Sequence, residues 1–224
     1  MTELTLDAPL LFETARAGEA NRVRFAERGL FVLNLMSGPG AGKTRLLERT
    51  LEGLAGELRI GVIEGDIEGA ADAARLARLG APVTTINTHG SCHLDPRPVM
   101  DAALSLPLAE LDLLVIENVG NLVCPAEFDV GESARAMLLS VPEGHDKPAK
   151  YPLMFRTADL LLINKIDLAD LCDFDADAAE HDARALNPAL DVVRLSCRTG
   201  EGLEGWFDWL KGRVGGGATG RPAR

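Results

Sequence analysis

A lysine and a threonine stand at the end of a glycine-rich segment, SGPGAGKT (37–44). An apolar run, FVLNLM, precedes this segment, and a helix-like stretch, RLLERTLEGLAG, follows it. Between a strand and a helix, glycines let backbone N–H groups point at an anion, and the helix dipole adds to the attraction. Lys43 is then placed to reach phosphates, and Thr44 to put its hydroxyl on Mg²⁺. The segment predicts a phosphate-binding loop in which Ser37 replaces the usual first glycine; a turn that binds no nucleotide is the alternative.

The sequence NKID (164–167) ends another apolar run and is placed to select the base. The Asp167 carboxylate can accept hydrogen bonds from the ring N–H and the exocyclic amine of guanine. Adenine has no such amine, and a buried carboxylate left unpaired disfavours it. Lys165 can lay its stem along the base while Asn164 braces the loop. NKID also occurs at ordinary strand exits, but downstream of a phosphate loop it favours GTP.

A third segment, SCR (196–198), follows a further apolar run, where a backbone N–H can meet the guanine carbonyl oxygen. Together the three segments supply the predicted nucleotide-binding residues: Gly38, Gly40, Ala41, Gly42, Lys43, Thr44, Arg45, Asn164, Lys165, Asp167, Ser196 and Cys197.

Two carboxylates close apolar runs near the expected phosphates, Asp66 in EGDIE and Glu117 in IENVG. Ligands of doubly wound sheets gather at the carboxyl ends of the strands, so we expect Thr44, Asp66 and Glu117 to form a Mg²⁺ site. Gly120 can offer its backbone N–H to the γ-phosphate. The predicted catalytic group is Lys43, Thr44, Glu117 and Gly120. Capping of a strand end is the alternative role for either carboxylate.

Two short segments carry soft metal ligands: Cys92 and His93 are adjacent, and Cys124 lies in NVGNLVCPAEF. Thiolate and imidazole suit Ni²⁺ or Zn²⁺ better than Mg²⁺. Three such ligands leave a tetrahedral site open, for water or for a second subunit. Because Cys124 closely follows Gly120, we expect the nucleotide state to change metal affinity. His89 is either a further ligand or an ordinary loop histidine, and adjacent Cys and His are often only structural.

Alternating apolar and helix-like segments indicate how these motifs are positioned. Strand-like runs fall at 31–36, 59–65, 82–87, 111–118, 136–141, 159–165 and 191–196. They are nearly continuous, as in parallel strands buried on both faces. The sequence thus predicts an α/β fold, a P-loop NTPase with a doubly wound, mostly parallel sheet flanked by helices. We expect a lead-in helix over 1–28, a GTPase domain with the Cys/His site over 29–212, and a flexible tail over 213–224.

Composition disfavours several classes of protein. The 224 residues carry a formal net charge of −11, which argues against nucleic acids and anionic membranes as partners. Apolar residues make up 46% of the chain, enough for one large core. The N-terminal segment lacks the pattern of a secretory signal, and four cysteines are too few for a disulfide scaffold. We therefore expect a cytoplasmic protein.

The motifs resemble those of the HypB family, the hydrogenase nickel-incorporation GTPases. The matching stretches run in order across residues 33 to 203: NLMSGPGAGKT, GVIEGDIE, INTHGSCHLD, IENVGNLVCPAEFD, SVPEGHDKPAKYP, LLINKIDL and SCRTGEGL. The related urease nickel GTPases place a proline between the Cys and the His, and this chain does not.

This resemblance implies a GTP-hydrolysing metallochaperone with slow turnover, which uses GTP, Mg²⁺ and Ni²⁺ or Zn²⁺. It implies a GTP- or metal-dependent homodimer with Cys92, His93 and Cys124 at the subunit interface. It also implies nickel transfer to the hydrogenase large subunit precursor with a HypA-type nickel chaperone. Residues 1–28 contain no Cys or His, so the tight N-terminal nickel motif of many members is not expected.

Two other functions fit parts of the sequence. A small-molecule P-loop kinase would be expected to have an arginine-rich lid segment, which this sequence does not show, and it would not need the NKID segment. A metal-binding module with a vestigial nucleotide site would not be expected to retain Lys43, Thr44, Glu117 and Asp167.

Overall fold

Seven parallel strands form one sheet in the computed structural model, which describes residues 8–66 and 70–216. The strands are β1 (Phe31–Ser37), β2 (Ile60–Asp66), β3 (Val83–Asn87), β4 (Leu113–Gly120), β5 (Ala134–Ser140), β6 (Leu160–Asn164) and β7 (Asp191–Arg194). Their order across the sheet is β3-β2-β4-β1-β5-β6-β7. Strand β1 is central. The chain adds β2 and β3 on one side of it, returns to place β4 between β2 and β1, and then adds β5, β6 and β7 on the other side. The carboxyl end of β1 is therefore the point where a doubly wound sheet opens a ligand crevice.

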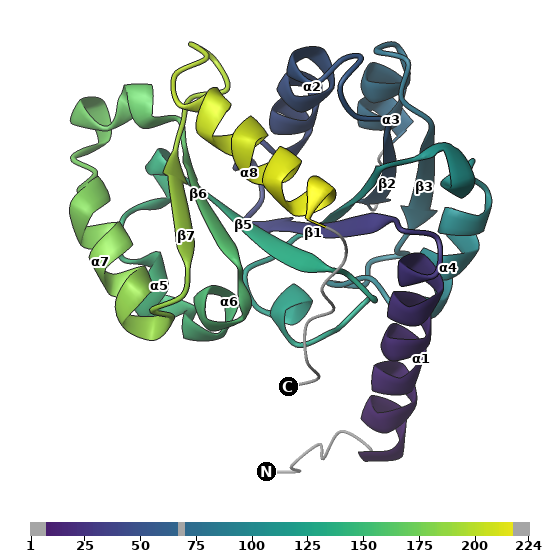
Figure 1. Cartoon of the computed structure of the whole chain (residues 1–224). Helices are drawn as coiled ribbons and strands as arrows, with labels where there is room; N and C mark the ends of the chain where they lie inside the picture. The colour runs from purple at the N-terminus through teal and green to yellow at the C-terminus, as the bar shows by residue number, and fades with distance from the viewer. Residues whose placement is uncertain (1–7, 67–69, 217–224) are drawn as a thin grey trace.

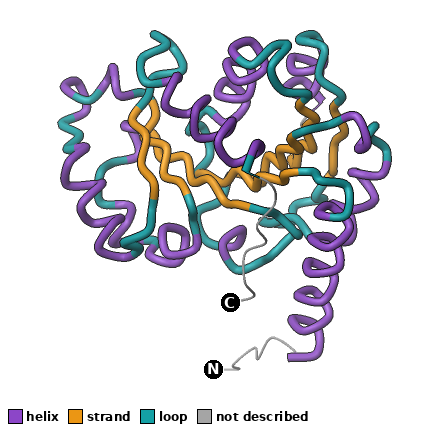
Figure 2. The backbone as a smooth tube through the Cα atoms, viewed as in Figure 1, coloured by secondary structure: helices purple, strands orange, loops and turns teal. Residues whose placement is uncertain are grey.

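Helices cover both faces of the sheet (Figures 1 and 2). Side chains of α2 (Lys43–Gly53), α3 (Ala70–Ala77) and α8 (Leu203–Gly215) pack on one face. Side chains of α1 (Ala8–Ala26), α4 (Pro96–Leu104), α6 (Pro152–Thr157) and α7 (Ala176–Leu186) pack on the other. Every residue of β1 and β5 is buried, because both strand faces meet a helical layer. The predicted fold class is confirmed.

Several element boundaries differ from the expected ones. The strand expected at 136–141 begins earlier, at Ala134, and ends at Ser140. Helices α5 (Lys147–Lys150) and α6 were not predicted, since four and six residues are too short to carry a periodic apolar pattern. Helix α8 continues through Gly215, into the segment expected to be a flexible tail, and residues 217–224 lie outside the described part of the chain.

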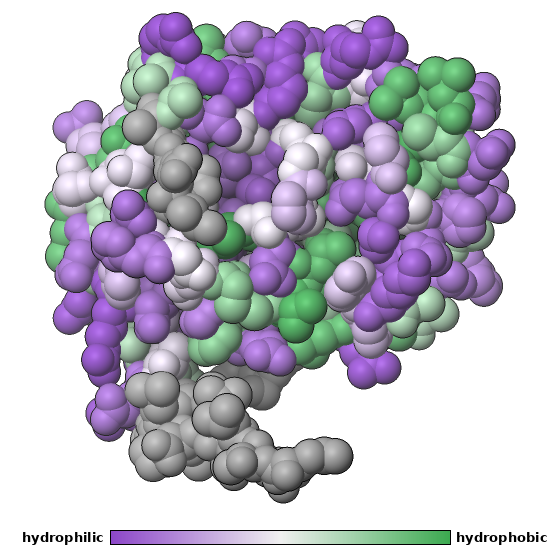
Figure 3. Space-filling view, turned by 180° about the vertical axis from the view of Figure 1, so that it is seen from behind, coloured by the Kyte–Doolittle hydropathy of each residue, from purple (hydrophilic) through white to green (hydrophobic). Residues whose placement is uncertain are grey.

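Polar side chains dominate the face opposite to the view of Figure 1, and apolar ones gather there only in small groups (Figure 3). In the segments that the structure describes, we find no helix with the length and apolar character needed to span a bilayer.

Candidate functional site

The glycine-rich segment forms a loop between β1 and α2 at the centre of the sheet. Gly42 precedes the helix with φ of +105°, a left-handed conformation that side chains disfavour. A Cβ at this position would also come within 2.9 Å of Asn164 Nδ2. Lys43 Nζ donates to Ser37 Oγ at 3.0 Å, so the lysine folds back over the loop. Ser37, in the place of the usual glycine, thus accepts a hydrogen bond from the lysine head.

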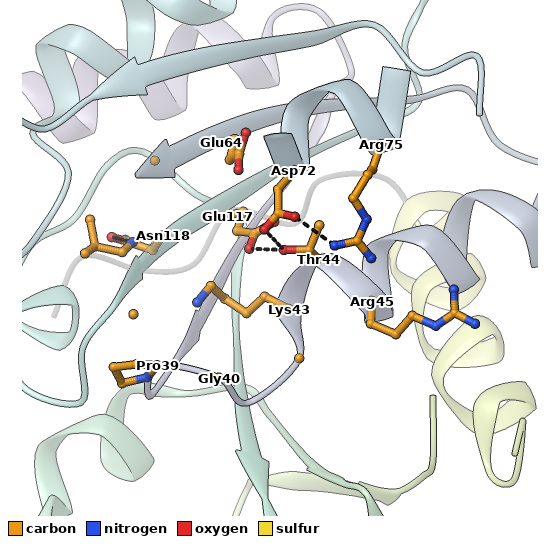
Figure 4. A pocket seen from close by; sticks show the side chains of 14 residues that line it. Pro39, Gly40, Lys43, Thr44, Arg45, Glu64, Asp72, Arg75, Glu117 and Asn118 are labelled. Carbon is orange, nitrogen blue, oxygen red and sulfur yellow. Dashed lines mark hydrogen bonds and ion pairs between the residues drawn. The ribbon is translucent and has the colours of Figure 1, made fainter. Parts of the chain in front are cut away.

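Acidic side chains surround the hydroxyl of Thr44. Its Oγ1 lies 3.0 Å from Asp72 Oδ2 and 3.1 Å from Glu117 Oε1 (Figure 4). Arg75 Nη1 donates to the other Asp72 oxygen at 2.8 Å, and buried Glu64 lines the same cleft. A hydroxyl flanked by carboxylate oxygens is the hard donor set that Mg²⁺ prefers. The residues present therefore fit a magnesium ion beside the phosphate loop.

Of the two predicted acidic ligands, Glu117 lies beside Thr44, and the structure does not test the prediction for Asp66. Asp66 ends β2, but its side chain lies outside the described residues. Asp72 and Glu64 were not recognised from the sequence. Glu64 lies inside a buried strand, where nothing marks it as a ligand. Asp72 was detectable, because it stands in the first turn of the helix that follows a strand end near the phosphates.

Phosphate-loop and acidic residues line a cleft of about 500 Å³. Its walls include Gly40, Lys43 and Thr44 from the loop and α2, and Glu117 and Gly120 from the end of β4. Arg45, predicted to touch nucleotide, also lines the cleft, and its guanidinium pairs with Glu48 at 2.8 Å. The cleft thus joins loop amides, a lysine and carboxylates, a combination that binds phosphate together with a divalent cation.

The NKID segment is attached to the phosphate loop by its own side chains. Asn164 Nδ2 donates to the Ala41 carbonyl at 2.9 Å, and its Oδ1 accepts from Cys197 N at 3.2 Å. Lys165, with φ of +63°, donates from Nζ to the Gly40 carbonyl at 2.8 Å. One asparagine therefore connects three segments that are far apart in the sequence. The bracing role predicted for Asn164 corresponds to these contacts.

Asp167 has partners on both carboxylate oxygens. The Ser196 hydroxyl donates to Oδ1, and Arg198 Nε donates to Oδ2 at 2.8 Å. These two contacts hold the pKa of the Asp167 carboxyl below its ordinary value. An ionised carboxylate that can exchange Arg198 for base N–H groups is the feature that guanine selection requires. The Cys197 thiol, by contrast, is buried, and this burial raises its pKa to about 11. Only the backbone N–H of Cys197 is therefore a candidate for contact with the guanine carbonyl oxygen.

The predicted soft ligands lie at the ends of two neighbouring loops. Cys92 follows β3, and Cys124 begins a short 3₁₀ turn after β4. A hydrogen bond with the Cys92 thiol, followed by burial, raises the pKa of the Cys124 thiol to about 11. Cys92 Sγ lies 3.7 Å from His93 Nδ1. The structure thus brings the two thiols together.

The imidazole of His93 stacks on the Phe128 ring, with centroids 3.6 Å apart and planes 7° from parallel. Burial lowers the pKa of His93, an effect opposed by Asp95 and Glu127. A neutral imidazole is the form that binds metals. Phe128 carried no signal in the sequence, because a phenylalanine beside a turn is usually only a core residue.

Within the residues that the structure describes, no three His, Cys, Asp or Glu side chains lie close enough together to hold a metal ion. Cys92 and Cys124 supply two soft donors, and His93 faces Phe128. Two thiols and a nearby imidazole match the chemistry of a Ni²⁺ or Zn²⁺ site but do not complete one in a single chain. His89 is exposed, with φ of +49°, and its backbone N–H bonds to Asn87 Oδ1.

A short path links the phosphate loop to Cys124. Gly120 passes so close to Pro39 that a Cβ would lie 3.1 Å from the Pro39 Cα. The next residue, Asn121, accepts from Val123 N at 2.7 Å and from Cys124 N at 3.3 Å, and its Nδ2 lies 3.8 Å from Cys124 Sγ. The backbone that carries the thiol thus continues directly from the glycine that packs on Pro39 of the phosphate loop.

Comparison with known proteins agrees with this arrangement. Residues 31–194 match the family model described as CobW/HypB/UreG, nucleotide-binding domain. The chain is 47% identical to the hydrogenase maturation factor HypB of Escherichia coli over 211 residues, covering 94% of this chain and 72% of that protein.

Two solved structures are also similar. The hydrogenase maturation factor HypB of Archaeoglobus fulgidus superposes with a TM-score of 0.85 at 40% identity, covering 90% of this chain and 98% of that one. HypB of Helicobacter pylori in complex with nickel gives a TM-score of 0.89 at 33% identity, covering 95% and 99%. On these matches over nearly its whole length, the chain belongs to the HypB family, within the wider CobW/HypB/UreG group of nucleotide-binding proteins.

Proposed function

We propose that this chain hydrolyses GTP and uses the nucleotide cycle to control nickel transfer during hydrogenase maturation. The observation that carries the proposal is the path from the phosphate loop through Gly120 and Asn121 to the Cys124 thiol. Two further findings support it: the relatives are hydrogenase maturation factors, and one of them forms a complex with nickel. The proposed client is a hydrogenase large subunit precursor, with a HypA-type nickel chaperone as the partner.

In the proposed reaction, Asp167 accepts the guanine N–H groups and Lys43 leaves Ser37 Oγ to contact the outer phosphates. Thr44 and Glu117 would hold a magnesium ion, with Asp72 beside them, and the ion would neutralise charge on the phosphates. The Gly120 backbone N–H faces the γ-phosphate. Water attacks in line, and the charge that develops on the leaving oxygens is stabilised by Lys43 and the loop amides. No side chain is assigned as a general base, so slow turnover is expected.

The proposed metal site takes Cys92, His93 and Cys124 from one subunit and is completed across a homodimer interface. Nickel is the cargo of this site, and Zn²⁺ is the alternative occupant by donor chemistry. Loss of the γ-phosphate releases Gly120, and the movement of Asn121 then changes the position of Cys124. Nucleotide state and nickel affinity are coupled in this scheme, by a factor of about 5 to 150 in a typical case.

Calorimetric titration of Ni²⁺ into the reduced protein tests this coupling, with GDP and with a non-hydrolysable GTP analogue. Cys92→Ala and Cys124→Ala should each weaken nickel binding by at least about 100-fold, since even outer contacts of metal ligands contribute about 10- to 100-fold. Cys172→Ala is the matched control, because that thiol is exposed at the end of a 3₁₀ turn after β6. Equal nickel affinity with either nucleotide, or nickel binding without both cysteines, would rule out the proposal.

Base selection has a separate test. Asp167→Asn should weaken GDP binding by about 100-fold or more, because an amide cannot accept both guanine N–H groups. Xanthine carries a carbonyl where guanine has its amine, so the variant should bind XDP better than the wild type does. A variant that still prefers GDP would show that Asp167 does not select the base.

A further inference from the structure

Helix α1 contacts both of the segments that carry the soft ligands. Its carboxyl-terminal half lies beside α4, and its first turns extend away from the sheet (Figure 1). Asn21, in that half, is only 4% exposed. Its side-chain amide donates to the Pro96 carbonyl at 2.6 Å and to the Val130 carbonyl at 3.1 Å. Pro96 begins α4, directly after the loop of Cys92 and His93, and Val130 lies on the segment that continues from Cys124.

Both amide hydrogens of Asn21 are therefore used, one on each segment. Val130 and Pro96 are both buried. Val130 lies outside the helices and strands, and a buried backbone oxygen without a partner is costly there. Among side chains of this length, only asparagine offers two N–H donors; a carboxylate of the same shape offers none when ionised. The bridge thus depends on the identity of this residue and not only on its size.

Neighbouring contacts fix α1 against the second segment. The Arg22 guanidinium donates to the Glu132 carbonyl and pairs with the Asp129 carboxylate. Gly18 passes so close that a Cβ would collide with the Asp129 carbonyl oxygen. These contacts leave α1 little freedom to shift relative to residues 129–132.

The sheet fixes the same segment from the other side. Arg135, in β5, donates to the carbonyls of Ala126 and Phe128, each at 3.1 Å. Phe128 in turn carries the stacked imidazole of His93. The stretch 124–132 is therefore anchored at both ends, and Asn21 is a direct link from this stretch to the loop of Cys92.

We propose that Asn21 is a positioning residue of the Cys/His site: by bridging the Pro96 and Val130 carbonyls, it sets the separation between the Cys92–His93 loop and the Cys124 segment. This inference rests on the proposed nickel function. It assigns helix α1 a role in metal affinity although residues 13–26 contain no Cys or His. Asn21 is not among the residues that line the nucleotide cleft.

The test compares Asn21→Asp with the wild type in the full-length chain. Nickel affinity is measured by competition with a chromophoric chelator, the nickel–thiolate charge-transfer band is recorded at saturation, and GDP affinity is measured in parallel. We expect nickel affinity to fall by about 10- to 100-fold, as for other contacts that orient metal ligands, with a changed band and GDP affinity within twofold. Arg24→Ala, an exposed change on the same helix, should alter none of these.

A second control separates positioning from loss of stability. Thr50→Val removes the acceptor of the buried Trp206 indole N–H, which lies 2.8 Å from Thr50 Oγ1, and should lower Tm without changing nickel affinity. If Asn21→Asp does not fold, as judged by GDP binding, Asn21→Ser replaces it; the hydroxyl keeps one donor, and an intermediate loss is expected.

Two results would overturn the inference, and they are distinguishable. If a folded Asn21 variant binds nickel within twofold of the wild type, with an unchanged band, Asn21 does not position the site and the proposed function stands. If the wild type shows no nickel binding that depends on Cys92 and Cys124, the proposed function fails and the inference fails with it.

Discussion

The nucleotide cleft and the Cys/His region differ in how completely one chain builds them. Among the predicted nucleotide-binding residues, Lys43, Thr44, Asn164 and Asp167 each have a defined partner within the chain. In the Cys/His region, two thiols meet but the imidazole is stacked on Phe128, and no three ligands converge within residues 8–66 and 70–216. The two regions differ because of their positions in the fold. The cleft lies at the carboxyl end of β1, where the strand order of the sheet reverses, whereas the thiols lie on loops beyond the strand ends. The nucleotide site is therefore preformed in one chain, whereas the geometry of the Cys/His site can change when its loops move.

The largest effect should come from the phosphate loop. Lys43→Ala removes the charge that contacts the phosphates, so GTP hydrolysis should fall by at least about 100-fold. Nickel affinity without nucleotide should stay unchanged if the two regions are built independently. Phosphate release and nickel titration measure the two quantities, and Lys211→Ala on α8 is the control. A loss of nickel binding in Lys43→Ala would show that the nucleotide cleft and the Cys/His region are not built independently.

The second effect concerns Asp72, the carboxylate that the sequence analysis missed. Asp72→Asn removes a charged acceptor of Thr44, so hydrolysis at low Mg²⁺ should fall by about tenfold and recover as Mg²⁺ is raised. Rates measured across a Mg²⁺ series, with exposed Asp182→Asn as control, test this. If added Mg²⁺ gives no recovery, Asp72 acts on something other than the magnesium site.

A smaller effect is expected on the metal side. Phe128→Leu removes the ring on which His93 stacks and should weaken nickel binding by about three- to tenfold, since such ring pairs contribute about 0.5–1.5 kcal/mol. Chelator competition measures the change. Phe174→Leu is the matched control, because Phe174 also contacts a histidine, His145, at a ring distance of 6.0 Å. Tighter nickel binding in Phe128→Leu would mean instead that the stack withholds the imidazole from the metal.

The smallest effect depends on pH. Guanine recognition needs ionised Asp167, whose pKa is lowered by Ser196 and Arg198, so GDP affinity should persist below the usual Asp range and fall as pH drops through the lowered pKa. In Arg198→Ala, the loss of GDP affinity should begin at a higher pH than in the wild type. At pH 7 the GDP affinity of the variant should stay within about threefold of the wild type, as expected for loss of an exposed ion pair.

The ratio of variant to wild-type affinity is the quantity to follow, because protonation of the nucleotide cancels in it. The measurement is confined to the pH range in which circular dichroism shows both proteins folded. A ratio that does not change with pH would mean that Arg198 has no influence on Asp167.

The fold class could be predicted from the sequence, and so could the phosphate loop between a strand and a helix. A glycine-rich turn, an NKID exit and continuous apolar runs are local patterns, and each depends on backbone geometry or on the burial of neighbouring residues. The placement of Lys43, Thr44 and Asn164 at one crevice followed from strand ends meeting at one edge of a parallel sheet.

The long-range partners of the site residues could not be predicted from the sequence. Asp72 meets Thr44, Phe128 meets His93, and Asn21 joins Pro96 to Val130, although these residues lie far apart in the chain or carry no motif. Such contacts depend on how helices pack on the sheet. A buried asparagine or phenylalanine reads in sequence like any other core residue.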